Sequence, residues 1–207
     1  MQKTTVPLRE RNRLDTWALI HNAASSLALE SGLTHATVEA IAESAGVSKR
    51  TFFNYFATKE DAVLGIQAPT LSADAEIAFR ADEGAELFGR TVHLMVAVIR
   101  SMFPDDSFTT QRKELTKAFP ELRKRMFEHV GAAEQLVESV LMERYNDDDA
   151  VRAGLPAGRD SAMALLMLAG TVMRFTYRRD PGAAFSDESA SVDKAIEIFR
   201  EVIPATL

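Results

Sequence analysis

Four side chains able to form directed hydrogen bonds stand within a stretch of six residues, at Lys49, Arg50, Thr51 and Asn54. An arginine guanidinium presents a planar fork of N–H donors, and an asparagine amide presents a donor beside an acceptor. Residues four apart lie on one face of a helix, so Arg50 and Asn54 would project together if this stretch is helical. Such a face is suited to contacting flat polar edges through paired hydrogen bonds.

Two short helices would position this face, and the spacing of apolar residues predicts them at 38–45 and 49–55. About three residues join them, including Gly46, which suits the positive φ that often follows a helix. This is the spacing of a helix-turn-helix. We expect Val47 and Phe52 to fill the angle between the two helices.

A helix of this width fits the major groove of B-DNA, where each base pair presents a distinct pattern of donors and acceptors. Arg50 can fork to guanine O6 and N7, and Asn54 can pair with adenine N6 and N7. Thr51 and Phe53 can contact the methyl group of thymine. The second helix is therefore predicted to recognise bases.

A second group of residues is expected to hold phosphates. Thr37, Ser48 and Thr58 each stand at the predicted start of a helix, where free N–H groups favour an anion, and Lys59 adds a cation. The N-terminal residues form a basic arm, which contains Lys3, Arg9, Arg11 and Arg13. This arm can reach a neighbouring part of the DNA backbone or the minor groove. Ordinary helix capping is the better explanation for any one hydroxyl, but the set together with Gly46 favours DNA binding.

Residues 37–64 resemble the DNA-binding segment of the TetR family of bacterial repressors, whose pattern runs roughly TV..IA..AGVS..T.Y.YF..KE.L. The matching residues are Thr37-Val38, Ile41-Ala42, Ala45-Gly46-Val47-Ser48, Thr51, Tyr55-Phe56, Lys59-Glu60 and Leu64. The run from Leu29 to Gly32 resembles the end of that family's first helix, so the resemblance covers about residues 10–66. It implies an all-α dimer of about nine helices, with a DNA-binding head and a divergent, ligand-responsive body.

Transferred position by position, the resemblance implies phosphate contacts by Thr37, Ser48, Tyr55 and Lys59 and base contacts by Lys49, Arg50, Thr51 and Asn54. Phe53 departs from the pattern, because the family usually has a tyrosine there whose hydroxyl bonds a phosphate. Arg50 departs as well, because glycine is common at that position. The operator sequence of a relative therefore cannot be transferred to this chain.

The rest of the chain is predicted to be helical, with no alternating run long enough for a strand. A first helix carries an apolar stripe from Leu14 to Ala28 and stops at Gly32. Thr58 and Asp61 resemble a capping box for a fourth helix, which Pro69 is expected to kink or interrupt. Further helices are predicted at 85–103, 108–119, 120–145, 159–179 and 192–202, with loops at 146–158 and 180–182.

Composition and charge narrow the class of protein. The 207 residues are 46% hydrophobic and 26% charged, as in globular chains, and the absence of cysteine excludes a disulfide scaffold and thiol catalysis. The net charge of −6 argues against an indiscriminate coat on nucleic acid. Residues 1–67 sum to zero with clustered cations, so residues 68–207 hold the whole acidic excess.

No feature of the sequence indicates a membrane protein or an enzyme. The longest strongly apolar stretch, 161–173, is too short to span a bilayer, and the N-terminus lacks the apolar core of a signal peptide. We therefore expect a soluble, cytoplasmic protein. The HExxH, GxSxG, P-loop and GxGxxG motifs are absent, so we expect no catalysis, cofactor or metal.

Residues 1–66 are predicted to form the DNA-binding domain, and residues 67–207 a ligand-binding and dimerisation domain. The stretch 161–173 is uncharged on all sides, and the final helix carries the apolar stripe Val192, Ala195, Ile196, Phe199, Val202 and Ile203. Packing within one chain would explain both helices as well as pairing with their copies does; the resemblance favours a homodimer. Candidate ligand-binding residues are Phe88, His93, Met95, Met102, Phe103, Phe127 and His129, although Met and Phe at helical spacing are more often ordinary core.

The sequence thus predicts a transcriptional repressor that binds operator DNA as a dimer and is released by an unknown small molecule. Two alternatives stay open. One is a ligand-independent DNA-binding or architectural protein with a filled helical core. The other, less favoured, is a helical carrier or enzyme with an incidental helix-turn-helix.

Overall fold

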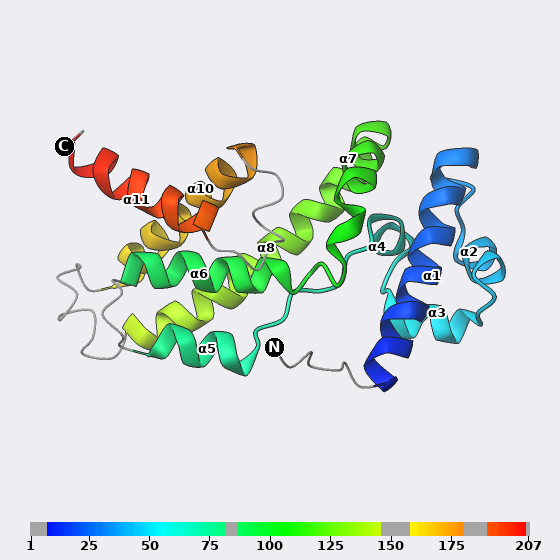
Figure 1. The fold of residues 1–207 in the computed structure, drawn as a ribbon, viewed down its shortest axis with the longest axis horizontal. Helices are drawn as coiled ribbons and strands as arrows, with labels where there is room; N and C mark the ends of the chain where they lie inside the picture. The colour runs from blue at the N-terminus through cyan, green and yellow to red at the C-terminus, as the bar shows by residue number, and fades with distance from the viewer. Residues whose placement is uncertain (1–7, 82–86, 146–157, 180–189, 206–207) are drawn as a thin grey trace, which may run out of the picture. The chain divides into compact units, whose positions relative to one another are not determined.

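The computed structural model describes residues 8–81, 87–145, 158–179 and 190–205. Within these ranges the chain forms ten α-helices and one 3-10 turn and no strand, which confirms the predicted all-α class (Figure 1). Contacts divide the chain into two units. The first unit contains residues 1–67 and 103–127, and the second contains residues 68–102 and 128–207.

The first unit consists of short helices around one long one. Its helices are α1 (Leu8–Ser31), α2 (Val38–Ser44), α3 (Lys49–Tyr55), α4 (Lys59–Leu64), the 3-10 turn η1 (Asp106–Phe108), α7 (Thr109–Ala118) and the first residues of α8 (Pro120–Tyr145). Helices α2 and α3 therefore lie within one or two residues of their predicted bounds, and α8 begins at Pro120 as expected.

A single hydrophobic core joins these helices. The buried stripe of α1, which includes Trp17 and Ile20, packs against Phe52 of α3 and Phe56 just after it. The Trp17 ring lies 5.7 Å from that of Phe56. Burying a large apolar side chain stabilises a fold by roughly 1.5–3 kcal/mol, so this core fixes one face of α3 firmly. Leu115 of α7 belongs to the same cluster.

Each of the three short helices begins at a hydroxyl cap, as predicted. The side chains of Thr37, Ser48 and Thr58 accept hydrogen bonds from the backbone N–H three residues ahead, at 3.2, 3.0 and 3.1 Å. Gly46 has a φ of 67°, the left-handed conformation expected in the turn between α2 and α3. At Thr58 the side chain accepts the backbone N–H of Asp61, as the predicted capping box requires, and the Asp61 carboxylate binds Arg125.

The end of α4 differs from the sequence prediction. The helix stops at Leu64, and Gly65 closes it with φ 59° and ψ 49°, so Pro69 neither kinks nor ends it. A Cβ on residue 65 would lie 2.8 Å from the ring of His21, so glycine also allows this close approach. The chain then starts a separate helix, α5 (Ala73–Arg80), and this raises the count to ten α-helices in the described ranges.

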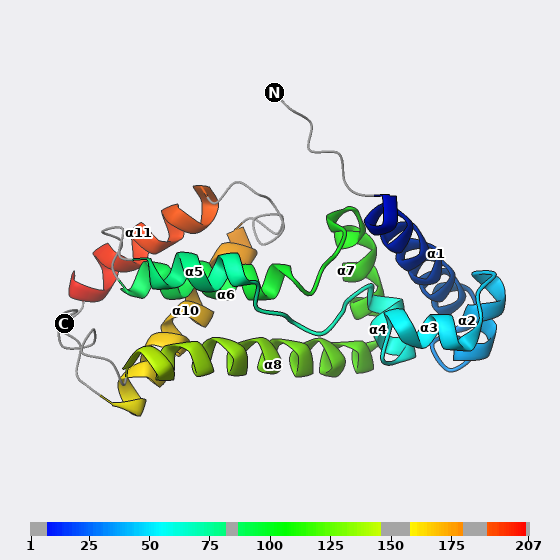
Figure 2. The ribbon, with the colours of Figure 1, turned by 90° about the horizontal axis from the view of Figure 1, so that it is seen from below.

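The second unit is a group of longer helices. Helix α6 (Leu87–Arg100) packs against α10 (Arg159–Arg179) and α11 (Ala190–Ala205), as Figure 2 also shows. Their shared core consists of Val92, Ala169, Val172, Val192, Ala195 and Ile196. Helix α10 has its predicted bounds. The loops predicted at 146–158 and 180–182 lie outside the described residues, except for Gly158, which forms a bend before α10.

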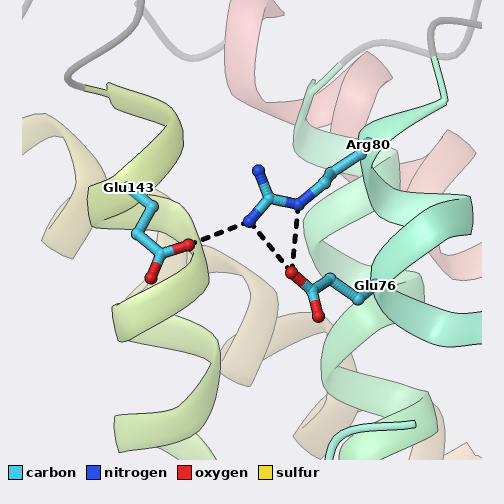
Figure 3. A network of polar contacts seen from close by, with 3 residues as sticks. All are labelled: Glu76, Arg80 and Glu143. Carbon is cyan, nitrogen blue, oxygen red and sulfur yellow. Dashed lines mark hydrogen bonds and ion pairs between the residues drawn. The ribbon is translucent and has the colours of Figure 1, made fainter. Parts of the chain in front are cut away.

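An exposed ion-pair network connects α5 with α8 in the second unit (Figure 3). The Arg80 guanidinium contacts Glu76 at 2.9 Å and Glu143 at 2.8 Å. The hydrogen bonds that Arg80 donates to Glu76 and Glu143 raise the pKa of Arg80 above its ordinary value. Such exposed pairs add little to stability, so this network orients α5 more than it stabilises the fold.

No helix among the described residues combines the length and the apolar character needed to cross a membrane.

Candidate nucleic-acid interface

Helix α3 has a buried face and an exposed polar face. Phe52 is fully buried, whereas Lys49, Arg50 and Asn54 are exposed, as the sequence predicted. Phe53 is 56% exposed on the same side, which is unusual for a large aromatic side chain. The exposed face therefore offers hydrogen-bond donors, an acceptor and one apolar ring to a partner.

The polar residues of α3 are engaged to different degrees. Lys49 Nζ contacts Glu39 Oε1 of α2 at 2.5 Å, and this hydrogen bond lowers the pKa of Glu39 below its ordinary value. Thr51 Oγ1 lies 2.8 Å from Ser48 Oγ. Within the described ranges, the side chains of Arg50 and Asn54 form no hydrogen bond. Of these polar residues, these two are therefore the most available for a partner.

The residues expected to contact phosphates lie around the ends of α2, α3 and α4. Thr37 and Ser48 are exposed, and their hydroxyls accept backbone N–H bonds. The Thr37 hydroxyl keeps its proton to donate, whereas the Ser48 and Thr51 hydroxyls share a hydrogen bond, which leaves one proton between them for a partner. Lys59 is half-buried, and its Nζ donates to the carbonyl of Leu33 at 2.7 Å. An ammonium has three donors, so Lys59 keeps two for an anion. Tyr55 is half-buried against the core.

The basic arm is only partly described. Lys3 lies outside the described residues. Arg9 and Arg11 are exposed and Arg13 is half-buried in the first turns of α1.

A buried ion pair holds α4, the helix that follows α3. Asp61 is 1% exposed, and both of its carboxylate oxygens accept hydrogen bonds from the Arg125 guanidinium at 2.7 Å. This is a two-point fork, the strongest common geometry for such a pair. Arg125 is in the part of α8 that belongs to the first unit, so the pair joins two segments 64 residues apart in the sequence.

The carbonyl groups at the end of α4 are also bound by side chains. Arg112 of α7 donates to the carbonyl of Leu64 at 2.8 Å and of Gly65 at 3.3 Å. Nδ1 of His21 lies 2.8 Å from the carbonyl oxygen of Ala62 and must carry the proton, since a carbonyl only accepts. A cation at a helix C-terminus also complements the helix dipole. Helices α1 and α7 thus fix the end of α4.

Burial dominates the electrostatics of His21. Its side chain is fully buried and lies against the Phe108 ring at 4.5 Å. Desolvation lowers the pKa of His21 from 6.5 to about 4, although the hydrogen bond with Ala62 acts in the opposite direction. The imidazole is therefore neutral at physiological pH.

Sequence analysis missed the roles of Asp61, Arg112 and Arg125. Asp61 was assigned to a capping box, and nothing near the two arginines in the sequence pointed to their partners. The only available signal was the position of Asp61 beside apolar residues of a short helix.

The division into units also separates the charges. The first unit contains 13 basic and 11 acidic residues and the second contains 11 and 19, so their net charges are +2 and −8. The segment 103–127 supplies the excess of cations in the first unit. The unit that holds α3 is thus the one that attracts a polyanion.

The seven candidate ligand-binding residues do not share one environment. Phe103 and Phe127 belong to the first unit, where Phe103 lies under the Arg112 guanidinium and Phe127 is 72% exposed. Met95, Met102 and His129 are buried in the second unit, and Phe88 packs against its α6–α10–α11 core. His93 is exposed, with Nε2 3.0 Å from Asp193. The described residues contain no group of three or more His, Cys, Asp or Glu side chains able to bind a metal.

Two short helices at a tight glycine turn, with a buried inner face and an exposed polar outer face, define a helix-turn-helix DNA-binding domain. Residues 20–65 match the family model described as bacterial regulatory proteins, tetR family. Residues 20–65 therefore form a DNA-binding domain of the TetR type, which supports a role in the regulation of transcription. No curated protein matches the chain.

Proposed function

We propose that the protein is a cytoplasmic repressor that binds operator DNA as a homodimer and leaves it when a small molecule binds. The observation that carries the DNA-binding part is the exposed outer face of α3, with Arg50 and Asn54 unengaged. In this proposal Lys49, Arg50, Thr51 and Asn54 contact bases. Thr37, Ser48, Tyr55 and Lys59 hold the flanking phosphates.

The exposed faces of the last two helices support a dimer. On α10, Ala164 and Leu168 are exposed next to Met167, which is 66% exposed, so an apolar patch is open in the single chain, with Thr171 and its hydrogen-bonded neighbour Arg174 at one end. On α11, Val202 is 52% exposed. Pairing each helix with its copy would remove this apolar surface from water, and two-fold symmetry would double a DNA site that is too short for one head.

Release by a ligand would have a reciprocal consequence, because coupling between two binding sites acts in both directions. If a ligand lowers the affinity for DNA by a given factor, DNA must lower the affinity for the ligand by the same factor, typically about 5- to 150-fold. The adaptable Met and Phe side chains of the second unit support such a binding role.

Genome-wide footprinting of the purified protein tests the proposal. We expect protected sites with two-fold symmetry and half-sites spaced by whole helical turns, and we expect the double variant R50A/N54A to lose them. As a control, Arg178→Ala removes a charge from the second unit and should keep the footprints. Uniform protection without sites, or sites that survive R50A/N54A, would contradict the proposed reading of bases by α3.

The filled interior of the second unit supports one alternative. Met95 and Met102 are 1% and 0% exposed, as expected for a core that holds no ligand. A ligand-independent DNA-binding protein would have such a core. A native mass spectrum of the purified protein distinguishes the ligand-responsive repressor from the ligand-independent protein. A retained small molecule supports the ligand-responsive repressor.

A further inference from the structure

A cavity of about 140 Å³ lies between the end of α10 and the start of α11. Its lining residues come from both helices and are Phe175, Thr176, Arg179, Ser191, Lys194 and Ala195. None of them is among the ligand-binding candidates that the sequence suggested. All of them belong to the second unit.

One side of the cavity is apolar and held in place. The Phe175 ring packs edge-on against Phe199 of α11, with ring centroids 5.6 Å apart. Ala195 is buried in the α6–α10–α11 core, so its methyl group closes the cavity with little freedom to move. A flat apolar group can therefore lie against this side without displacing core residues.

The rest of the cavity lining is positively charged, because it includes the side chains of Arg179 and Lys194. The Arg179 guanidinium lies 5.5 Å from the centroid of the Phe175 ring, a cation–π contact that restricts its orientation. Lys194 adds an ammonium from α11. Across the described residues, neither cation has an ion-pair partner.

The first turn of α11 adds to the positive potential of the cavity. Helix α11 is 16 residues long and begins at Ala190, so Ser191 lines the cavity in the first turn, where the helix dipole is positive. The acidic residue of this turn, Asp193, contacts His93 at 3.0 Å. The cavity thus combines an apolar side with cationic donors.

We propose that this cavity binds a small organic anion, a planar carboxylate joined to an apolar group about the size of a benzene ring. The ring would lie against Phe175 and Ala195, and the carboxylate would accept hydrogen bonds from Arg179 and Lys194. The size is appropriate, because an engineered apolar cavity of about 150 Å³ is known to hold benzene. The proposal concerns binding within the second unit and does not depend on DNA recognition.

Titration calorimetry of the full-length chain with benzoate tests the proposal, and benzamide serves as the neutral analogue of the same shape. We expect saturable benzoate binding with a Kd of roughly 10 µM to 1 mM, as suits a ligand of this size. Benzamide should bind about tenfold more weakly or not at all, because the charge-assisted hydrogen bonds are lost. Acetate, which lacks the ring, should show no saturable binding.

Variants locate the site. Arg179→Gln and Lys194→Gln should each weaken benzoate binding by about five- to tenfold, since each removes a charged donor. Arg178→Gln is the matched control, because Arg178 is the exposed neighbour on the same helix and does not line the cavity. All three positions are exposed, so the variants should keep the helical circular dichroism of the parent.

Three results would overturn the proposal. These are equal affinities for benzoate and benzamide, an equal loss of affinity in R178Q and R179Q, and no saturable binding of benzoate by the parent chain.

Discussion

Arg50 and Lys59 are both cations of the candidate DNA-binding surface, but the structure gives them different environments. Arg50 is exposed on α3 and forms no side-chain hydrogen bond with the described residues. Lys59 is half-buried and bonded to the Leu33 carbonyl, so its ammonium is held at a fixed place near the start of α4. A free fork suits a base edge, and an anchored point charge suits a phosphate.

The two cations should therefore respond differently to removal. Lys59→Ala should weaken binding to all DNA sequences about equally and reduce the slope of log K against log salt by about one. Arg50→Ala should relax discrimination at one base pair by about 1–3 kcal/mol. Fluorescence anisotropy with operator variants at several salt concentrations measures both effects. An unchanged salt slope for K59A would remove Lys59 from the phosphate contacts.

The buried His21 makes stability depend on pH. Its pKa is 6.5 in the unfolded chain and about 4 in the folded one, so between these values the unfolded state binds the extra proton. The stabilisation is complete above about pH 6.5 and is lost as the pH falls toward 4, by up to about 3 kcal/mol. Urea unfolding between pH 7.5 and 4.5 measures this loss.

His21→Gln should flatten this pH dependence, although it also lowers stability at neutral pH. The matched control is His35→Gln, because His35 is an exposed histidine of the same unit. If H21Q keeps the full pH dependence of the parent, His21 is not its source.

At the level of the helices, α4 is held by side chains from three other helices. It is only six residues long, too short to be stable alone, yet four of its residues are buried. Asp61 pairs with Arg125, and the carbonyls near its end accept hydrogen bonds from His21 and Arg112. Since α4 follows α3 after only three residues, we expect these contacts to hold the recognition helix in place as well.

Removing one member of the buried ion pair should be costly. Arg125→Met leaves the Asp61 carboxylate buried without its main partner, and such changes cost about 3–5 kcal/mol. The double variant D61L/R125M should recover much of that loss, because it leaves no buried charge. Urea unfolding at pH 7 of the parent, both single variants and the double variant measures the coupling. If the loss of unfolding free energy in the double variant equals the sum of the losses in the two single variants, Asp61 and Arg125 are not strongly coupled.

Gly65 should tolerate no side chain. Gly65→Ala places a residue in the left-handed conformation and brings a Cβ to 2.8 Å from His21, so we expect a loss of about 1–3 kcal/mol or more. Gly131→Ala is the matched control, because its Cβ would meet no atom within 4 Å and it lies inside α8. That variant should gain up to about 1 kcal/mol from helix propensity. Thermal unfolding measured by circular dichroism compares the two.

At the level of the whole molecule, the chain combines a positively charged unit with a strongly acidic one. A net charge of +2 on the first unit and −8 on the second favours DNA contact by the first unit only. The exposed apolar residues of α10 form the surface that we propose for contact with a second copy of the chain. Oligomeric state and DNA binding are therefore expected to be separable by mutation.

Met167→Asp should weaken the proposed dimer by about tenfold or more, since it buries a charge in an apolar interface. Ile77→Asp is the matched control, because Ile77 on α5 is also 66% exposed. Sedimentation velocity at several protein concentrations measures both. If the two variants behave alike, or if the parent is a monomer, the interface lies elsewhere or does not form.

Local features of the sequence were enough to determine α2, α3, the start of α8 and the exposed face of α3, but not the separate helix α5. The hydroxyl caps at Thr37, Ser48 and Thr58, the turn at Gly46 and the start of α8 at Pro120 all depend on residues within a few positions of one another. Local hydrogen bonds and backbone preferences act at that range, so the pattern of residues predicts them.

Only the tertiary structure decided which distant segments meet. The Asp61–Arg125 pair spans 64 residues, and Arg112 reaches back 48 residues to the carbonyl of Leu64. The grouping of 103–127 with the first unit and the cavity between α10 and α11 also follow from packing. The neighbours of a charged or aromatic residue in the sequence indicate which face of a helix it is on. Its contact partner depends on how the helices pack against one another.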